Sequence, residues 1–182
     1  MDFKVKFRAF KLGDEVFINK LREDEEMEKK IGGFKRFVSI DREEKWVRDV
    51  ILGDSQTIFY FAVTKIESSD IIGYISISDI DYRNGTCVWG GMKLDQNEFG
   101  KGYGTQIALL TLKYIFEELR MVRCSAACQE EHTVILKIFE KVGYKREGLM
   151  RKSLFKNGKH INQWLLSAVD EDYENIKKKY NL

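Results

Sequence analysis

The stretch Phe99-Gly100-Lys101-Gly102-Tyr103-Gly104 decides the fold of this chain. It lies between an expected strand, Thr86–Leu94, and an amphipathic helix expected over residues 102–119. Three alternating glycines at a strand-to-helix junction let the backbone approach a ligand closely. They also leave the first amides of the helix unpaired, at the positive end of the helix dipole. The loop therefore predicts a phosphate or pyrophosphate site, to which Lys101 adds a positive charge.

Two well-known phosphate-binding loops do not fit this stretch. A P-loop requires a glycine at the position of Asp95 and a serine or threonine directly after the lysine, where Gly102 stands. The dinucleotide-binding fingerprint requires its third glycine at position 105, which is Thr105. An ordinary glycine-rich turn is the structural alternative.

Length and composition set the class of protein. The chain has 182 residues, 43% of them hydrophobic and 33% charged, which is typical of one globular domain spanning residues 1–182. A net charge of +2 argues for no particular partner, and no apolar run approaches the length of a membrane span. The N-terminal stretch has no apolar signal-peptide core, so we expect a cytoplasmic location. Three cysteines without paired metal spacing predict core packing and no metal site.

Periodicity predicts alternating groups of strands and helices, which pack as a mixed, mostly antiparallel sheet with helices on both faces. The dipeptides Asn84-Gly85 and Asn157-Gly158 predict hairpin turns. The expected strands cover residues 3–8, 57–65, 71–80, 86–94, 122–129, 144–148, 149–155 and 160–169, and the expected helices cover 14–22, 23–30, a segment from Asp41, 102–119, 132–142 and 170–179.

Two segments resemble the GCN5-related N-acetyltransferase (GNAT) family. "FGKGYGTQ" matches the family's acyl-CoA pyrophosphate motif, Gln/Arg-x-x-Gly-x-Gly/Ala, except that Phe99 stands where glutamine or arginine is usual. "ILKIFEKVGYKREGLMRKSLFKNGKHIN" resembles "IxxYEKxGFxxEGxxRxxxxxNGxxxD" of the branch that includes spermidine acetyltransferases and ribosomal-protein-alanine N-acetyltransferases. The two segments follow each other in the family's order, and the resemblance covers residues 71–169.

The resemblance implies an α+β fold in which two central parallel strands splay apart and hold acyl-CoA in the V between them. Here these strands are Thr86–Leu94 and residues 122–129, and Gly90-Gly91 is a candidate for the bulge that opens the V. The Met92 amide is implied to polarise the thioester carbonyl. The residues that the resemblance assigns to acetyl-CoA are Met92, Lys93, Leu94, Phe99, Gly100, Lys101, Gly102, Tyr103, Gly104, Thr105, His132 and Phe139.

The chain departs from the family where a proton donor is expected. Many relatives carry a tyrosine at the position of Phe139, which has no hydroxyl to give. An asparagine that holds pantetheine is often found at the position of His132, and a serine at Ile135. His132 is a candidate to bind the cofactor or to protonate the thiolate, because imidazole titrates near neutrality. An exposed histidine at the start of a helix is the alternative interpretation.

The general base is less well defined. Asp79 and Asp81, near the end of a strand, are candidates that would act through water, and we select Asp81 as the catalytic one. Simple solvation of a hairpin end explains them equally well. The run "EDEEME" at residues 23–28 lies in the region that lines the acceptor side in relatives, where it would attract a cationic amine. A solvated helix face is again the alternative, and His160 on the last hairpin is expected to be structural.

The sequence therefore predicts an acetyl-CoA-dependent N-acetyltransferase that acts on a primary amine by direct attack in a ternary complex. A polyamine-like small amine is slightly favoured over a protein N-terminus or an amino sugar. A CoA-binding sensor that has lost catalysis is the alternative from another class, and a nucleotide-binding protein is a weaker one. No nucleic acid, membrane or metal partner is expected. A homo-oligomer, dimer or larger, is compatible with the family.

Overall fold

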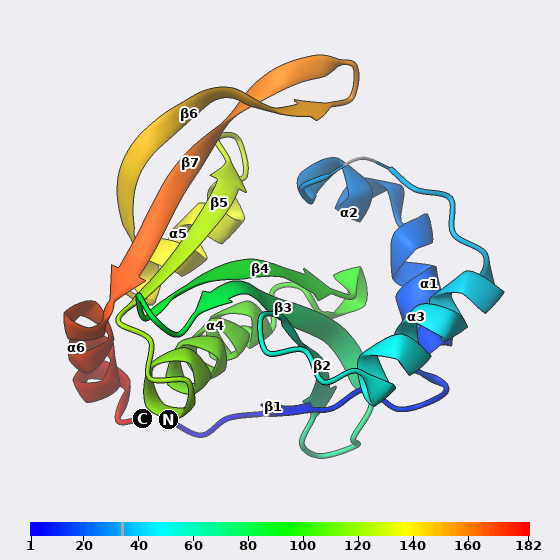
Figure 1. The fold of residues 1–182 in the computed structure, drawn as a ribbon, viewed down its shortest axis with the longest axis horizontal. Coiled ribbons are helices and arrows are strands. Elements are labelled where there is room, and N and C mark those ends of the chain that lie inside the picture. Colours follow the sequence, from blue (N-terminus) through cyan, green and yellow to red (C-terminus); the bar gives the residue numbers. More distant parts are fainter. Residues whose placement is uncertain (34) are drawn as a thin grey trace.

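A seven-stranded sheet organises the computed structural model, which describes residues 1–33 and 35–182 (Figure 1). The strand order is β1-β2-β3-β4-β5-β7-β6. The strands are β1 (Val5–Arg8), β2 (Phe59–Lys65), β3 (Ile71–Asp81), β4 (Thr86–Leu94), β5 (Arg123–Gln129), β6 (Lys145–Lys156) and β7 (Lys159–Val169). The helices are α1 (Asp14–Glu23), α2 (Glu25–Lys30), α3 (Ile40–Leu52), α4 (Tyr103–Lys113), α5 (Thr133–Lys141) and α6 (Asp170–Tyr180), with a 3-10 turn at Gln96–Glu98.

Alternate residues of the central strands point to two different cores. Ala62 and Tyr74 pack with Ile18 of α1 and Val47 of α3. Their neighbours along the chain, including Ile75, pack against α4 and α5 on the other face. Because successive side chains of a strand point to opposite faces, helices must cover both faces of this sheet. The predicted mixed α+β architecture with helices on both faces is confirmed.

The parallel neighbours in the sheet order, β4 and β5, separate soon after they start. Their paired positions are Thr86 with Arg123, Cys87 with Cys124, and Val88 with Ser125. From there β4 runs on to Leu94 and β5 to Gln129 without pairing to each other. The register between β3 and β4 skips Gly90, since Ser76 pairs with Gly91 and Ile77 with Trp89. The predicted V is thus present, and the extra residue of its bulge is Gly90.

Three predicted boundaries are corrected by the structure. The strands expected at 144–148 and 149–155 form one strand, β6, because Gly148 lies beside a register shift and does not end the strand. The helix expected to run to residue 119 changes at Tyr114 into a π-helical turn, in which the Leu119 amide donates to the Tyr114 carbonyl. The helix expected from Asp41 begins at Ile40, because the Ser39 hydroxyl caps it.

Three further features concern the residues that the structure describes. None of the helices in residues 1–33 and 35–182 combines the length and apolarity needed to cross a membrane. The same residues contain no cluster of histidine, cysteine and carboxylate side chains that is suited to a metal ion. The three cysteines are free and buried, as the sequence predicts.

Candidate functional site

The glycine loop places unpaired amides at the start of α4. Gly100 and Gly102 have φ angles of 76° and 81°, which glycine adopts without steric cost. No side chain caps the helix at Gly102, and the Gln106 amide bonds back to the Gly102 carbonyl. The amides of residues 103–105 therefore have no acceptor within the helix. A Cβ at Gly100 or Gly102 would meet no atom within 4 Å, so open space lies beside these donors.

Lys101 takes part in a small charge network. Its ammonium lies 2.9 Å from a Glu98 carboxylate oxygen, and Lys65 lies 2.8 Å from the other oxygen. Hydrogen bonds from Lys65 and Lys101 lower the pKa of Glu98, so two cations face one anion beside the loop. The Phe99 side chain is half exposed, whereas Tyr103 is buried in the core. Tyr103 can therefore offer a ligand its backbone amide but not its ring.

The end of β4 presents different side chains to the two faces of the sheet. A Cβ at Gly104 would lie 3.8 Å from the Met92 side chain, so Met92 points toward the glycine loop. The Lys93 ammonium lies 5.4 Å from the centre of the Tyr74 ring, on the face covered by α1 and α3. Leu94 is buried. The structure thus brings the three predicted contact residues of β4 to the open edge of the V, with Lys93 turned away from the loop.

His132 lies on the opposite limb of the V, directly after β5 and before α5. Burial lowers its pKa, with a further contribution from nearby Lys30. The imidazole is therefore mainly neutral at pH 7, which suits hydrogen bonding better than proton donation. It lines a cavity of about 290 Å³ together with Lys29, Lys30, Gln129, Glu131, Lys156, Asn157, Lys159 and Ile161.

Phe139 is buried in an aromatic cluster at the base of the V. Its ring lies edge-on to Trp89 at 5.1 Å and to Tyr144 at 4.7 Å between ring centres. The Tyr144 hydroxyl donates to the Cys124 sulfur at 3.0 Å, and burial raises its pKa well above the ordinary value. The Trp89 indole donates to the Gly91 carbonyl, which ties this cluster to the bulge. Trp89 was not predicted as a site residue, although a large aromatic side chain directly before Gly90-Gly91 could have indicated it.

Asp81 is the last residue of β3 and lies beside the first residue of β4, far from the glycine loop. Its carboxylate accepts hydrogen bonds from the Arg83 and Asn84 amides and from the Asn84 side chain, which lower its pKa. Asp81 pairs with Thr86, whereas Met92 pairs with Ile75 six residues along β3. At about 3.3 Å per residue, the two positions are about 20 Å apart along the strand. The structure therefore does not bring Asp81 together with Met92 and His132, and a turn-stabilising role accounts for all its hydrogen bonds.

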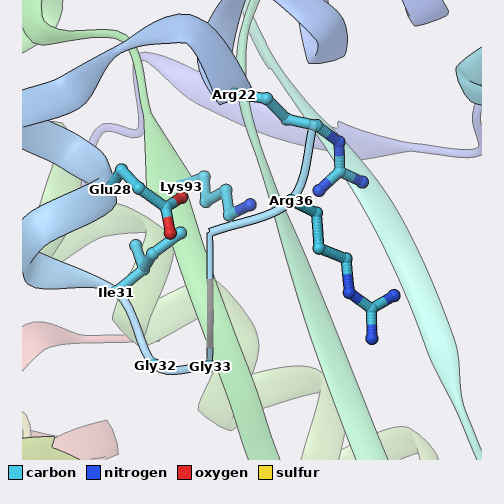
Figure 2. A pocket seen from close by; sticks show the side chains of 7 residues that line it. All are labelled: Arg22, Glu28, Ile31, Gly32, Gly33, Arg36 and Lys93. Atoms are coloured by element: carbon cyan, nitrogen blue, oxygen red, sulfur yellow. The ribbon is translucent and has the colours of Figure 1, made fainter. Parts of the chain in front are cut away.

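A second cavity, of about 220 Å³, lies on the side of the sheet covered by α1 and α2 (Figure 2). Arg22 from α1 lines it and binds Glu43 of α3 through two hydrogen bonds. Lys93 from β4 also lines it, and burial lowers the pKa of this lysine to about 8, with a further contribution from Arg22. Lys93 was predicted from the sequence to contact the cofactor, and Arg22 was not predicted as a site residue. The remaining lining residues are Glu28, Ile31, Gly32, Gly33 and Arg36.

The acidic run at residues 23–28 is near this cavity, but most of its carboxylates already have partners. Asp24 caps α2 by accepting from the Met27 amide, and Glu26 pairs with Lys29 at 2.7 Å. Glu28 binds Lys156 at 2.9 Å. The run therefore offers a cationic ligand less free negative charge than its number of carboxylates suggests. His160 is exposed on the β6–β7 hairpin and lies against the Phe155 ring.

Comparison with known proteins identifies the family of this fold and site. Residues 4–145 match the family model of the acetyltransferase (GNAT) domain. The chain belongs to the GNAT family of acetyltransferases, and the resemblance seen in its sequence is confirmed. Related proteins include the uncharacterized N-acetyltransferase p20 of Bacillus licheniformis, 26% identical over 113 residues, or 62% of this chain and 63% of that protein. The chain thus spans just under two thirds of that relative.

Two further comparisons have broader coverage. The uncharacterized N-acetyltransferase YokL, derived from the SPbeta prophage of Bacillus subtilis, is 25% identical over 137 residues, which cover 75% of this chain and 74% of that protein. The spermidine N-acetyltransferase of Vibrio cholerae, crystallised with CoA and spermine, has a TM-score of 0.85 at 20% identity. That match covers 94% of this chain and 99% of the other, and it establishes the shared fold.

Proposed function

We propose that this protein transfers the acetyl group of acetyl-CoA to a primary amine, by direct attack of the amine in a ternary complex. The unpaired amides at the start of α4, beside the open end of a splayed strand pair, are the observation that carries this proposal. Those amides and the two lysines around Glu98 suit a pyrophosphate. The edge of β4 that faces β5 suits an extended pantetheine arm, because in residues 1–33 and 35–182 the paired positions of these two strands end at Val88.

The chemistry requires a neutral amine, a stabilised oxyanion and a leaving thiolate. As the amine nitrogen bonds to the thioester carbon, the carbonyl oxygen gains negative charge, and the Met92 amide is our candidate donor to it. The carbon–sulfur bond then breaks, and the amine gives its extra proton to solvent water. Neither Phe139 nor a mainly neutral His132 is suited to protonate the sulfur, so the thiolate takes its proton from water. His132 is assigned to hydrogen bonding of the cofactor.

The acceptor class is the finer part of the proposal. A polyamine is supported by the acidic run near α2 and by the fold shared with a protein whose crystal holds spermine. The ion pairs of Glu26 and Glu28 oppose it, because paired carboxylates attract a cation weakly. A protein N-terminus and an amino sugar remain alternatives within the same reaction.

A CoA-binding sensor without transfer activity is the second candidate, favoured by one observation. Phe139 replaces the hydroxyl-bearing side chain of many relatives, and the hydroxyl of its neighbour Tyr144 is buried and donates to the Cys124 sulfur. Release of free thiol from acetyl-CoA in the presence of an amine would exclude this candidate. A panel of amino acids, N-terminal peptides, amino sugars and polyamines covers the acceptor classes named above.

Substitution of Gly102 tests the pyrophosphate site. Gly102→Ala places a methyl group in the open space beside the free amides, so we expect acetyl-CoA to bind at least tenfold more weakly. Gly158→Ala is the matched control, since Gly158 has a similar φ of 78° and equally open surroundings in the β6–β7 turn. Both substitutions carry a similar backbone strain of about 1 kcal/mol. Calorimetric titration with acetyl-CoA measures the effect, and equal affinities of the two variants would contradict the site.

A further inference from the structure

The cavity between α1, α2 and β4 contains an unusual lysine. Lys93 comes from the strand that carries the proposed oxyanion donor, Met92, and points to the opposite face (Figure 2). It is partly buried, with the Tyr74 ring 5.4 Å from its ammonium. In residues 1–33 and 35–182, no carboxylate lies within ion-pairing distance of this ammonium. Burying a cation without a counter-ion is costly, so a ligand that supplies the missing negative charge would be stabilised.

The carboxylates around Lys93 are already bound to other cations. Glu43, which is 0% exposed, accepts both of its hydrogen bonds from Arg22. Glu28 accepts from Lys156 at 2.9 Å. The charged and titratable groups that surround Lys93 are thus Arg22 on α1, Glu28 on α2, Glu43 on α3, Tyr74 on β3, and Arg36 in the cavity lining. The charges of Arg22 and Glu43 cancel, as do those of Lys156 and Glu28. Without counting Arg36, Lys93 therefore leaves one positive charge in excess.

We propose that the acceptor of this enzyme is a small amine that carries a carboxylate, and that Lys93 binds that carboxylate in this cavity. The inference deepens the proposed acetyl transfer and rests on it. An ammonium supplies one positive charge, which matches a carboxylate better than a doubly charged phosphate. Lys93 is therefore a specificity-determining residue, placed next in sequence to the residue that faces the reacting thioester.

Size and charge also separate this ligand from a polyamine. A volume of about 220 Å³ holds about seven groups of the size of a water molecule, which suits an amino acid or the end of a short acidic peptide. A polyamine is longer, and its ammonium groups would meet Lys93 beside Glu28 and Glu43, which already bind Lys156 and Arg22. Coulomb repulsion between two such cations at close range costs on the order of 1–4 kcal/mol, depending on exposure to solvent. The cavity therefore favours a carboxylate over a cation.

Matched pairs of acceptors test the proposal directly. L-amino acids are compared with their own amides, which have the same size but no negative charge, and spermidine and 2-aminoethyl phosphate complete the panel. We expect kcat/KM with acetyl-CoA to be at least tenfold higher for the free carboxylate than for the amide. Lys93→Met should reduce that ratio to about one, whereas Lys93→Arg should retain most of it. Lys178→Met, which removes an exposed lysine of α6, should leave the ratio unchanged.

The pH dependence gives a readout that a purely structural role for Lys93 would not produce. The pKa of Lys93 is lowered to about 8, so the ammonium is charged below pH 8 and loses its charge above it. Affinity for the carboxylate acceptor should fall as the pH rises through about 8. In Lys93→Arg the guanidinium stays charged, so the affinity should remain level over the same range.

Several outcomes would overturn the inference. A native protein that acetylates amides or spermidine as well as carboxylates would refute it and leave acetyl transfer intact, as would preference for the phosphate. A Lys93→Met protein with an unchanged ratio would also refute it. If no amine is acetylated, the proposed function fails, and calorimetric titration of the CoA-bound protein with amino acids and their amides decides the inference separately. Equal binding of acid and amide would then overturn it.

Discussion

Burial determines what individual residues can do in this site more than residue type does. Lys93 and Lys101 are both lysines beside the V, yet Lys101 is paired with Glu98 and Lys93 is desolvated with its pKa lowered. His132 resembles a proton donor in sequence, but burial keeps its imidazole mainly neutral. Removing a charged group from water disfavours its charged form, so these two side chains are suited to recognition and hydrogen bonding.

At the residue scale, Glu43→Gln should strongly destabilise the protein. Glu43 is fully buried and holds Arg22 with two hydrogen bonds, so its loss leaves a cation without its counter-ion. We expect the free energy of unfolding to fall by about 3 kcal/mol. Glu44→Gln, one position along α3, breaks an exposed pair with Arg48 and should cost about 0.5 kcal/mol. Urea denaturation measures both, and equal losses would show that Arg22 does not depend on Glu43.

At the scale of elements, β5, β6 and β7 are joined by one polar cluster. Arg123 of β5 binds both oxygens of Glu147 of β6, and Ser167 of β7 donates to the same carboxylate at 2.6 Å. The cluster lies where β4 and β5 are still paired, because Arg123 is the partner of Thr86. It therefore stabilises the closed end of the V, from which the two limbs diverge.

This cluster predicts a pH-dependent contribution to stability. Hydrogen bonds from Arg123 and Ser167 lower the pKa of Glu147 from its ordinary 4.5 to about 2. A lowered folded pKa means that the stabilisation is complete above pH 4.5 and is lost as the pH falls toward 2. Because Glu147 is 35% exposed, we expect Glu147→Gln to cost only about 1 kcal/mol at pH 7.

The difference between native protein and Glu147→Gln should shrink as the pH falls from 4.5 to 2, in urea unfolding at each pH. Glu67→Gln, at an exposed turn between β2 and β3, is the control and should show little effect at either end. A difference that stays constant across this range would argue against the charged hydrogen bonds as its source.

At the scale of the whole molecule, segments far apart in the sequence meet around the two cavities. Lys156, at the tip of the β6–β7 hairpin, is 6% exposed and binds both Glu28 and the Gly33 carbonyl. The Gln129 side chain at the end of β5 donates to the carbonyls of Lys29 and Ile31. Residues 29–33 are thus held by the hairpin and β5, and they contribute to the lining of both cavities.

Lys156→Met should loosen this segment. The substitution removes two hydrogen bonds to residues 28 and 33, so we expect the amides of residues 25–33 to exchange with solvent deuterium about tenfold faster. Lys159→Met, on the same hairpin but exposed, is the control and should leave exchange unchanged. Mass spectrometry after timed exchange compares the two, and identical rates would show that Lys156 does not hold the segment.

The sequence by itself determined the features that depend on neighbouring residues. The glycine loop, the bulge at Gly90-Gly91 and the two hairpin turns follow from local backbone preferences, which a short window of residues contains. Residue periodicity likewise predicted a sheet covered by helices on both faces. Boundaries were less accurate, as at Tyr114 and Gly148, because hydrogen bonds of type i to i+5 and register shifts have no distinct residue pattern.

Only the tertiary structure decided which charges are free. From the sequence, Glu28 belongs to an acidic run that would attract a cationic amine. In the structure it pairs with Lys156, which lies 128 positions further along the chain. Lys93 was assigned to the cofactor, and its position in a cavity depends on how α1 to α3 pack over β3 and β4. Charge and pKa at a site depend on distance and burial in three dimensions, which residue order does not specify. The sequence therefore established the family of the protein, and the packed fold established the electrostatics of its site.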